Sequence, residues 1–544
     1  MKKIISAITM CMALSLTLSA QRTMPQAMQK LLNAEYAIMS LYVDTVNEDK
    51  LVEEAIKGML ESLDPHSSYT DAKETKDLEE PLQGEFSGVG IQFNMNKDTL
   101  YVIQTIPGGP SERVGILAGD RIIYVNDTTI AGVKMKNSEI QKRLRGKKGT
   151  IVTVKVQRPG VKELITFRIT RDNIPLHSID ASYMLDDKTG YMLISRFGAK
   201  THEEMIDALK ELKKQGMTQL IMDLGDNGGG YLNAAIDMCN EFLERGQLMV
   251  YTEGDNSPRN EANANGWGEY KDLHIVVIVN QYSASAAEIF AGAMQDWDRA
   301  VIVGRRTFGK GLVQRPFKFE DGSMMRLTVA RYYTPSGRCI QKPYNRGDKK
   351  SYEKELLDRA NEGEYYSLDS IQFNDTLRYT TRLNGRTIYG GGGVMPDVYV
   401  PIDTSEYSTY YRDLQAKGII NQYVIGYLDK HRKSLSTQFP TIADFDNRFE
   451  VSDEMMQGLI ALGEKDSVKY DEEKYHISER LIKIIAKGLI ARDLFANQSA
   501  YTVILNHRNP DVQAAYEVLN DHERYNRLLR EGNPEYERLV KHSN

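Results

Sequence analysis

Three short segments of the chain carry side chains that could perform nucleophilic chemistry. They are Asp-Leu-Gly-Asp-Asn-Gly-Gly-Gly at 223–230, Ser-Ala-Ser-Ala-Ala-Glu at 283–288 and Thr-Phe-Gly-Lys-Gly-Leu-Val-Gln at 307–314. Each follows a short apolar run typical of a strand. Because an open parallel sheet collects its functional groups at the carboxyl ends of its strands, we expect the three segments to lie at one sheet edge.

Ser285 is the candidate nucleophile of the second segment. It begins a predicted helix over residues 285–296, where unbonded N–H groups and the helix dipole stabilise negative charge. The neighbouring alanines leave room for the backbone of a substrate. An ordinary serine cap beside small packing residues has the same local sequence, so this segment alone leaves that alternative open.

The glycine-rich run at 223–230 predicts a site for an anion. Glycines between a strand and a helix let backbone N–H groups face a negative charge without obstruction by side chains. A phosphate loop is the main alternative, but no Lys-Ser or Lys-Thr pair follows and the Rossmann spacing of glycines is absent. We therefore interpret this run as an oxyanion site.

Lys310 is the charged residue of the third segment, 25 positions after Ser285. A lysine between two glycines is usually a solvated turn residue. Here the lysine opens a run of alternating apolar residues at the same expected sheet edge, which favours a meeting with Ser285 without establishing it. None of the nine histidines lies in a motif beside a carboxylate, so a Ser–His–Asp triad has no support.

Strands alternate with helices between residues 185 and 335, which indicates βαβ units and a mostly parallel sheet. Residues 25–75 follow a helical period, whereas 84–172 contain short strands with glycine-rich turns. Residues 342–390, rich in charge and tyrosine, predict an irregular insertion. The chain after about 405 is helical and charged, as in a scaffold or association domain. The expected core strands are 191–197, 219–224, 274–279 and 300–303, and the expected core helices are 202–215, 231–244 and 285–296.

The composition is that of a globular protein of two to four units: 544 residues, 41% hydrophobic, with a net charge of −6. This charge gives no reason to expect nucleic acid or an anionic membrane as a partner.

Residues 1–20, with Lys2 and Lys3 before an apolar run, predict a signal peptide, the alternative being an uncleaved anchor. We expect an exported protein of the periplasm or cell envelope. Cys239 and Cys339 are predicted to be buried free thiols.

Taken together, the three motifs resemble the C-terminal processing (tail-specific) peptidases, the bacterial branch of the S41 serine peptidases. The resemblance covers roughly residues 30–340 and the segment Gly391–Val400, which is similar to the closing strand of the family. It implies an α/β, multidomain chain with a mostly parallel crotonase/Clp-like protease core, an inserted β-rich PDZ domain and helical N- and C-terminal regions. The implied units are a signal peptide at 1–20, an N-terminal helical region at 25–83, the PDZ domain at 84–172, the peptidase core at 173–403 with the insertion 342–390, and a C-terminal helical domain at 404–544.

The resemblance also implies the roles of individual residues. The nucleophile falls on Ser285, the general base on Lys310 and the glutamine that orients this lysine on Gln314. The oxyanion donors fall on the backbone N–H groups of Ala286 and Gly230. No metal or cofactor is implied. A buried, apolar setting has to lower the pKa of Lys310, to which Phe308 and Leu312 are expected to contribute.

Two further segments match the family. His66, in the run Leu63–Tyr69 before the PDZ domain, is expected to be structural and not catalytic. In the PDZ domain, the residues expected to receive the terminal carboxylate of a substrate are Gly88, Val89, Gly90 and Ile91. The substrate peptide would add a strand to the PDZ sheet.

One departure stands out: Gly225 occupies the position at which the family usually has an arginine beside the oxyanion loop. The ordering of this loop is therefore expected to differ.

The implied activity is that of a serine endopeptidase acting on envelope or exported proteins with free C-termini. The resemblance and the helical C-terminal region suggest homo-oligomerisation through that region and an adaptor protein as further partners. A catalytically weak or inactive PDZ scaffold is the first alternative. A crotonase-like acyl-CoA enzyme is the second, although it has no use for a signal peptide or a PDZ domain.

Overall fold

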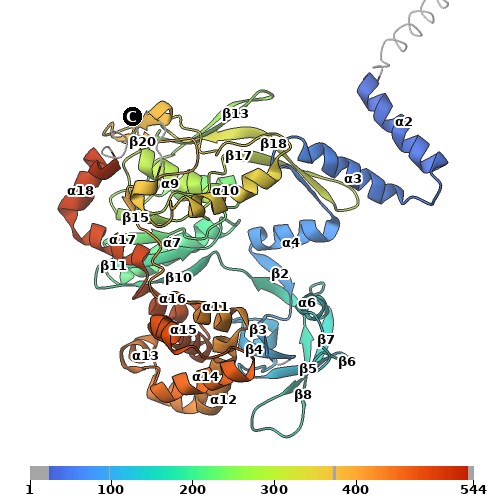
Figure 1. Ribbon diagram of the computed structural model, residues 1–544, viewed down its shortest axis with the longest axis vertical. Helices are drawn as coiled ribbons and strands as arrows, with labels where there is room; N and C mark the ends of the chain where they lie inside the picture. The colour runs from blue at the N-terminus through green and yellow to red at the C-terminus, as the bar shows by residue number, and fades with distance from the viewer. Residues whose placement is uncertain (1–23, 97, 372–374, 537–544) are drawn as a thin grey trace, which may run out of the picture.

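The computed structural model describes residues 24–96, 98–371 and 375–536 (Figure 1). The predicted signal peptide at 1–20 lies outside these ranges. Within them, no helix combines the length and the apolar character that crossing a bilayer requires.

A six-stranded sheet forms the centre of the molecule, with the strand order β10-β11-β12-β15-β16-β21. The pair β10–β11 is antiparallel and every other neighbouring pair is parallel, which confirms the predicted mostly parallel sheet. The short closing strand lies within the predicted segment Gly391–Val400. The strands are β10 (Ile179–Met184), β11 (Thr189–Ile194), β12 (Gln219–Asp223), β15 (His274–Val279), β16 (Val301–Gly304) and β21 (Val398–Tyr399).

Both faces of this sheet are covered by helices. Side chains of a strand alternate between the two faces, so Val277 packs in one apolar cluster and Val276 in the other. Helices α7 (Thr201–Lys214), α8 (Leu232–Asn240) and α9 (Ala286–Asp296) contribute to the first cluster. The second cluster is completed by the distant helices α17 (Pro510–Asn520) and α18 (His522–Glu531) (Figure 1).

A second sheet is built around the long strand β18 (Met324–Tyr333). β18 pairs with β17 (Leu312–Lys318) and with β1 (Ser68–Thr70). The pairing with β1 brings the N-terminal segment around His66 to this second sheet. The remaining strands of this sheet are β13 (Leu248–Gly254) and β14 (Ser257–Asn263).

The PDZ unit is a separate small sheet with its own apolar core. It is joined to the rest of the chain by a two-stranded stalk, in which β2 (Glu85–Gly88) pairs antiparallel with β9 (Asp172–Pro175). The strands of the sheet are β3 (Ile91–Asn96), β4 (Thr99–Thr105), β5 (Arg121–Val125), β6 (Thr128–Thr129), β7 (Ile151–Gln157) and β8 (Ile165–Thr170). Its helices are α5 (Pro110–Arg113) and α6 (Asn137–Leu144).

Helical segments surround these sheets. At the N-terminal end, α2 (Gln26–Leu41) contains no buried residue and projects away from the body (Figure 1). It is followed by α3 (Glu48–Glu61) and α4 (Ala72–Gln83). The insertion at 342–390, predicted to be irregular, contains the regular helix α10 (Lys349–Asn361), which Asp348 caps. The helices α11 (Thr409–Ala416), α12 (Ile419–Gln438), α13 (Ile442–Arg448), α14 (Asp453–Lys465), α15 (Glu472–Phe495) and α16 (Gln498–Asn506) share a core of their own.

Candidate active site

Ser285 lies at the first turn of α9, after the loop that follows β15. Its backbone has φ 57° and ψ −114°, a region that residues with a side chain seldom occupy. Such strained positions cluster at functional sites, where the surrounding structure holds them in place. The residue is 8% exposed, so its hydroxyl lies in a largely enclosed setting. Burial raises the pKa of Tyr332, a residue of β18, to about 12, and the nearby Ser285 side chain opposes this rise.

The glycine-rich loop packs directly against the backbone of Ser285. A Cβ atom at Gly229 would lie 2.6 Å from the Ala284 carbonyl oxygen and 2.9 Å from the Ala286 nitrogen, so a side chain there would clash. Gly230 follows with φ 151° and forms an isolated parallel bridge with Phe197. Over the residues that the structure describes, the N–H groups of Ala286 and Gly230 make no hydrogen bond. Both are therefore available to a negatively charged oxygen beside Ser285.

Glu288 connects the nucleophile segment with the lysine segment. Its Oε2 atom accepts hydrogen bonds from the backbone N–H groups of Ser285 and Lys310, each at 2.8 Å. Its Oε1 atom accepts from the Thr307 hydroxyl at 2.5 Å and the Gly309 N–H at 2.7 Å. Burial raises the pKa of this carboxyl, while the four donors oppose the rise. The Ser-x-x-Glu pattern at the helix start is the sequence signal that points to this residue.

Lys310 lies in the loop between β16 and β17, with its side chain partly buried. Burial lowers its pKa, and the nearby Arg326 cation lowers it further, whereas Glu288 and Asp64 act in the opposite direction. Leu312 is buried beside it, but Phe308 packs against Tyr352 of the insertion. A lowered pKa makes the neutral amine more accessible near neutral pH, as a general base requires.

Gln314 lies on β17, and its side-chain amide has two hydrogen-bond partners. Its Nε2 atom donates to the Leu312 carbonyl at 3.1 Å and to the Thr328 hydroxyl at 3.4 Å. Across the described residues, no hydrogen bond joins Gln314 and Lys310. The Gln314 amide is thus held by residues of β17 and β18.

The segment before the PDZ domain supplies a carboxylate that sequence reasoning missed. Asp64 accepts hydrogen bonds from the backbone N–H groups of His66 and Ser67 and from the Thr328 hydroxyl. His66 Nε2 lies 2.9 Å from the Tyr352 hydroxyl. Burial, with the Lys310 cation, lowers the pKa of His66 to about 3, so the imidazole is neutral near pH 7.

The oxyanion loop is ordered without an arginine at position 225. Asp223 accepts hydrogen bonds from the Tyr191 hydroxyl and the Gly225 N–H, both at 2.7 Å. Asp226, the residue after Gly225, is held by the side chain of Asn280. This side chain accepts a hydrogen bond from the Asp226 N–H and donates one to the Asp226 carboxylate. Burial raises the pKa of Asp223 to about 6. Short polar side chains therefore hold this loop where the family has an arginine.

The PDZ unit has a groove beside its edge strand. Phe86, Val89, Gly90 and Ile91 line a pocket of 130 Å³ together with Phe93 and residues of the α6 region, namely Gln141, Leu144 and Arg145. β3 is at the edge of the sheet, so its outer backbone groups can pair with an added strand. Of the four predicted carboxylate-binding residues, three line this pocket, and Gly88 precedes them in the stalk strand β2.

Family comparisons match four parts of the chain. The profile described as peptidase family S41 matches residues 188–348, and the profile described as PDZ domain matches residues 87–169. The profile of the activating protease CtpB N-terminal domain matches residues 10–75. A family of unknown function matches residues 410–496, within the C-terminal helices.

Two curated relatives and one solved structure are similar to the chain. A carboxy-terminal-processing protease of Bartonella bacilliformis is 35% identical over 344 residues, which cover 62% of this chain and 78% of the relative. The carboxy-terminal processing protease CtpA of Bacillus subtilis is 37% identical over 336 residues, covering 61% of this chain and 70% of the relative. The structure of a photosystem II D1 C-terminal processing protease is 30% identical, with a TM-score of 0.33, and covers 57% of this chain and 89% of that one.

Proposed function

Because the chain belongs to the S41 family of carboxy-terminal processing proteases, it is a serine endopeptidase, and we propose that Ser285 and Lys310 form its catalytic dyad. One observation carries this proposal: the backbone nitrogens of both residues share a single carboxylate oxygen of Glu288. The lysine pKa, lowered mainly by burial, and the unbonded N–H groups of Ala286 and Gly230 support it.

In the proposed mechanism, neutral Lys310 takes the proton of the Ser285 hydroxyl while the Ser285 oxygen attacks the peptide carbonyl. The N–H groups of Ala286 and Gly230 hold the oxyanion that forms. Lys310 then gives its proton to the departing amine, which leaves an acyl-enzyme ester on Ser285. In the second half, Lys310 takes a proton from water, the hydroxide attacks the ester, and the proton returns to the Ser285 oxygen.

We further propose that the PDZ groove selects substrates by their C-terminal tails. The tail would add a strand along β3, with its carboxylate in the Gly88–Gly90 segment. The apolar lining by Val89 and Ile91 suits an apolar side chain near the end of the tail. The predicted signal peptide at 1–20 makes exported or envelope proteins the proposed substrates.

The test of the dyad is cleavage of an unstructured protein by the wild type and by Ser285→Ala and Lys310→Ala. Both variants should lose activity by at least about 10³-fold and keep their far-ultraviolet spectra, since a residue of a catalytic unit is not replaced by its neighbours. Lys318→Ala, an exposed lysine of β17, is the matched control and should keep full activity. Undiminished cleavage by Lys310→Ala would refute the dyad, and no cleavage by the wild type would favour the PDZ scaffold.

The test of tail selection compares two substrates that differ only at the C-terminus. Amidation of the tail removes the carboxylate charge, so we expect a higher KM for the amidated substrate with little change in kcat. Equal KM values for the free and the amidated tails would contradict the proposed role of the groove.

A further inference from the structure

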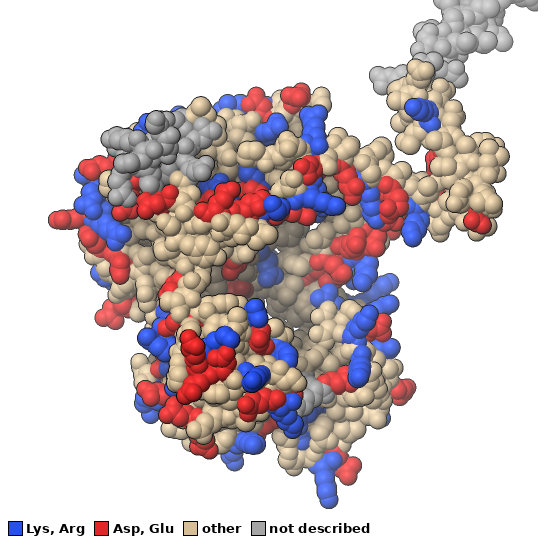
Figure 2. Space-filling view, in the orientation of Figure 1, with Lys and Arg blue, Asp and Glu red and all other residues tan. Residues whose placement is uncertain are grey.

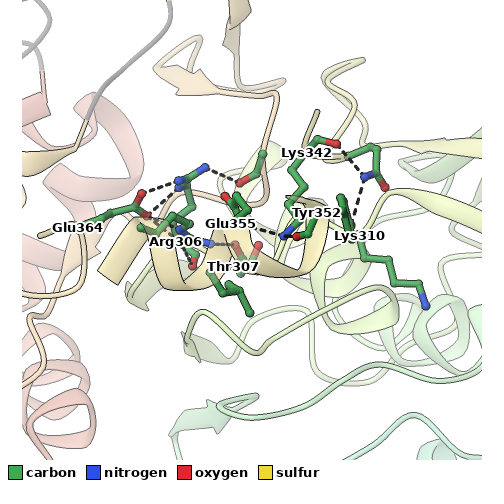
Figure 3. A network of polar contacts seen from close by, with 12 residues as sticks. Arg306, Thr307, Lys310, Lys342, Tyr352, Glu355 and Glu364 are labelled. Atoms are coloured by element: carbon green, nitrogen blue, oxygen red, sulfur yellow. Dashed lines mark hydrogen bonds and ion pairs between the residues drawn. The ribbon is translucent and has the colours of Figure 1, made fainter. Parts of the chain in front are cut away.

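The insertion at 342–390 lies directly against the loop that carries Lys310. Its helix α10 lies beside this loop, and polar side chains reach from the insertion to Arg306 and Thr307 (Figure 3). We refer to Lys342, Tyr352, Glu355, Arg359 and Glu364 as the insertion clamp. No residue of the insertion belongs to the motifs that made the chain recognisable.

Arg359 holds the main chain of the lysine loop. It is 3% exposed, and its Nη1 and Nη2 atoms donate to the carbonyl oxygens of Thr307 and Arg306 at 3.1 and 2.8 Å. The same guanidinium donates to Glu364 Oε1 through Nε at 3.0 Å and through Nη2 at 2.7 Å. A planar fork that binds two consecutive carbonyls fixes the direction of the peptide chain, which a lysine with one nitrogen cannot do.

Glu364 binds the side chain of Arg306 in the same loop. Its two carboxylate oxygens accept from Arg306 Nε at 2.8 Å and from Arg306 Nη2 at 2.5 Å. Arg306 Nη1 also donates to the Gly392 carbonyl at 3.0 Å. The pair Arg359–Glu364 therefore restrains both the main chain and the side chain of Arg306, four residues before Lys310.

Lys342 and Tyr352 hold the next part of the loop. Lys342 is 2% exposed, and its Nζ lies 4.3 Å from the ring centre of Phe308 and 4.2 Å from that of Tyr352. Glu355 neutralises this cation at 2.7 Å. The backbone N–H of Lys342 donates to the Gly309 carbonyl at 2.9 Å.

The contacts of the insertion clamp reach as far as Gly309, one residue before Lys310. They do not involve the Lys310 amine. The Lys310 side chain extends away from the insertion clamp (Figure 3). Among the described residues, its Nζ makes no hydrogen bond or ion pair. The backbone at 306–309 therefore decides where the amine lies and how deeply it is buried. Buried ion pairs add little net stability, which favours a positioning role for so many charges.

We propose that the insertion clamp positions the general base, with Arg359 and Tyr352 as positioning residues that act through the backbone of Lys310. This inference rests on the proposed role of Lys310. A misplacement of about 1 Å in a catalytic group can cost about 100-fold in rate, so a held loop matters to the reaction more than to the fold.

The test is the pH profile of peptide hydrolysis by Arg359→Met. Methionine keeps an apolar stem and removes the fork, so the lysine loop loosens and Lys310 becomes more hydrated. Its pKa then rises, and the acid limb of kcat/KM moves to higher pH. If the acid limb moves up by one pH unit, kcat/KM at a pH below the limb falls by about tenfold. We expect kcat to fall and KM to stay within about twofold, because the binding groove is untouched.

Two further variants sharpen the comparison. Arg359→Lys should restore part of the rate, since its single ammonium reaches one of the two carbonyls. Lys354→Met is the matched control: it removes an exposed ion pair with Asp358 on the same helix and should leave the pH profile unchanged.

The inference is overturned if Arg359→Met folds and keeps the acid limb and kcat of the wild type. If that variant does not fold, Tyr352→Leu decides instead. It removes the ring that packs against Phe308 and lies 4.2 Å from Lys342 Nζ, so it should also move the limb upward, and an unmoved limb overturns the inference. Activity in Lys310→Ala would instead show that the dyad is wrong, whatever the clamp variants do.

Discussion

The Glu288 carboxylate is wholly buried and accepts four hydrogen bonds, three from backbone N–H groups and one from a hydroxyl. These donors belong to the helix start at Ser285 and to the loop at 307–310. All four acceptor sites of the carboxylate are therefore occupied by donors of these two segments, and the carboxylate fixes how the segments lie relative to each other. A carboxylate with these partners is well suited to hold the strained backbone of Ser285.

Glu288→Gln is predicted to lower both stability and kcat. An amide presents N–H groups where the site already has donors, so at least one buried N–H loses its acceptor. Such a loss costs about 1–3 kcal/mol. Urea unfolding and steady-state kinetics measure the two effects. Glu320→Gln, at an exposed position after β17, should change neither, and wild-type kinetics in Glu288→Gln would contradict the alignment role.

Residue types in the three motifs were sufficient to identify Ser285, Lys310 and the glycine-rich loop as candidates. They were not sufficient for Asp64 or Arg359. Neither residue is near the motifs in sequence: Asp64 reaches the site through the pairing of β1 with β18, and Arg359 through the packing of α10. Gln314 was assigned to the lysine from resemblance, whereas its amide bonds Leu312 and Thr328.

At the scale of elements, α17 connects the C-terminal end of the chain to the sheet that carries the site. Arg305 follows β16, and its Nη1 and Nη2 atoms donate to the Asp511 carboxylate at 2.9 and 2.8 Å. Its Nε atom donates to Gln281 at 3.1 Å. α17 also packs Val512 and Val518 into the apolar cluster on this face of the sheet. The helix is therefore part of the peptidase core in space, although it lies more than 200 residues after β16 in the sequence.

Asp511→Ala is predicted to destabilise the peptidase core by about 3–5 kcal/mol, because the buried Arg305 cation loses its carboxylate. The midpoint of urea unfolding, followed by intrinsic fluorescence, measures the loss. Asp521→Ala, at the exposed cap of α18, is the comparison and should cost about 1 kcal/mol. The double variant Arg305→Met/Asp511→Leu should recover much of the stability; equal midpoints for Asp511→Ala and Asp521→Ala would contradict the prediction.

At the scale of the whole molecule, the PDZ unit contacts the rest of the chain at more than one place. The stalk of β2 and β9 joins it to the core, and α12 lies against the outer face of its sheet (Figure 1). On β4, Tyr101 and Ile103 point away from the PDZ core and are buried against Ile425 of α12. Arg121 and Asp429 form an ion pair at 2.6 Å beside this contact.

The buried apolar part of the contact between α12 and the PDZ sheet is small. A cavity of 1020 Å³ lies beside it, lined by Tyr101, Arg121, Tyr423, Asp429 and neighbouring residues of α12 and α14. Figure 2 shows the surface hollowed between the peptidase core and the lower half formed by the PDZ unit and the C-terminal helices. The C-terminal helices thus set where the PDZ groove lies relative to the core.

Charge reversal at this contact is predicted to free the PDZ sheet. Arg121→Asp and Asp429→Arg each place like charges together, so the amides of Thr99–Thr105 should exchange hydrogen faster in either variant. The double variant should restore slow exchange, because the opposite charges meet again. Lys430→Asp, one residue along α12, is the control. Unchanged exchange in both single variants would show that the ion pair does not hold the PDZ unit.

The sequence by itself determined the elements and the chemistry. Apolar runs of strand length, glycines after strands and a serine at a helix start are local signals, and they predicted the mostly parallel sheet, the candidate nucleophile and the short strands at 84–172. The family resemblance, and not these signals, implied that the strands at 84–172 form a PDZ domain. These properties depend on the order of residues within a few turns or one strand, which a sequence displays directly.

Only the tertiary structure decided which distant elements meet. An amphipathic helix has an apolar face, but its sequence does not name the surface that this face covers. The covering of the central sheet by α17 and α18, the contact of α12 with the PDZ unit and the grip of α10 on the lysine loop all join segments far apart in the chain. Such contacts follow from packing of whole surfaces, and the spacing of residues along the chain carries no record of them.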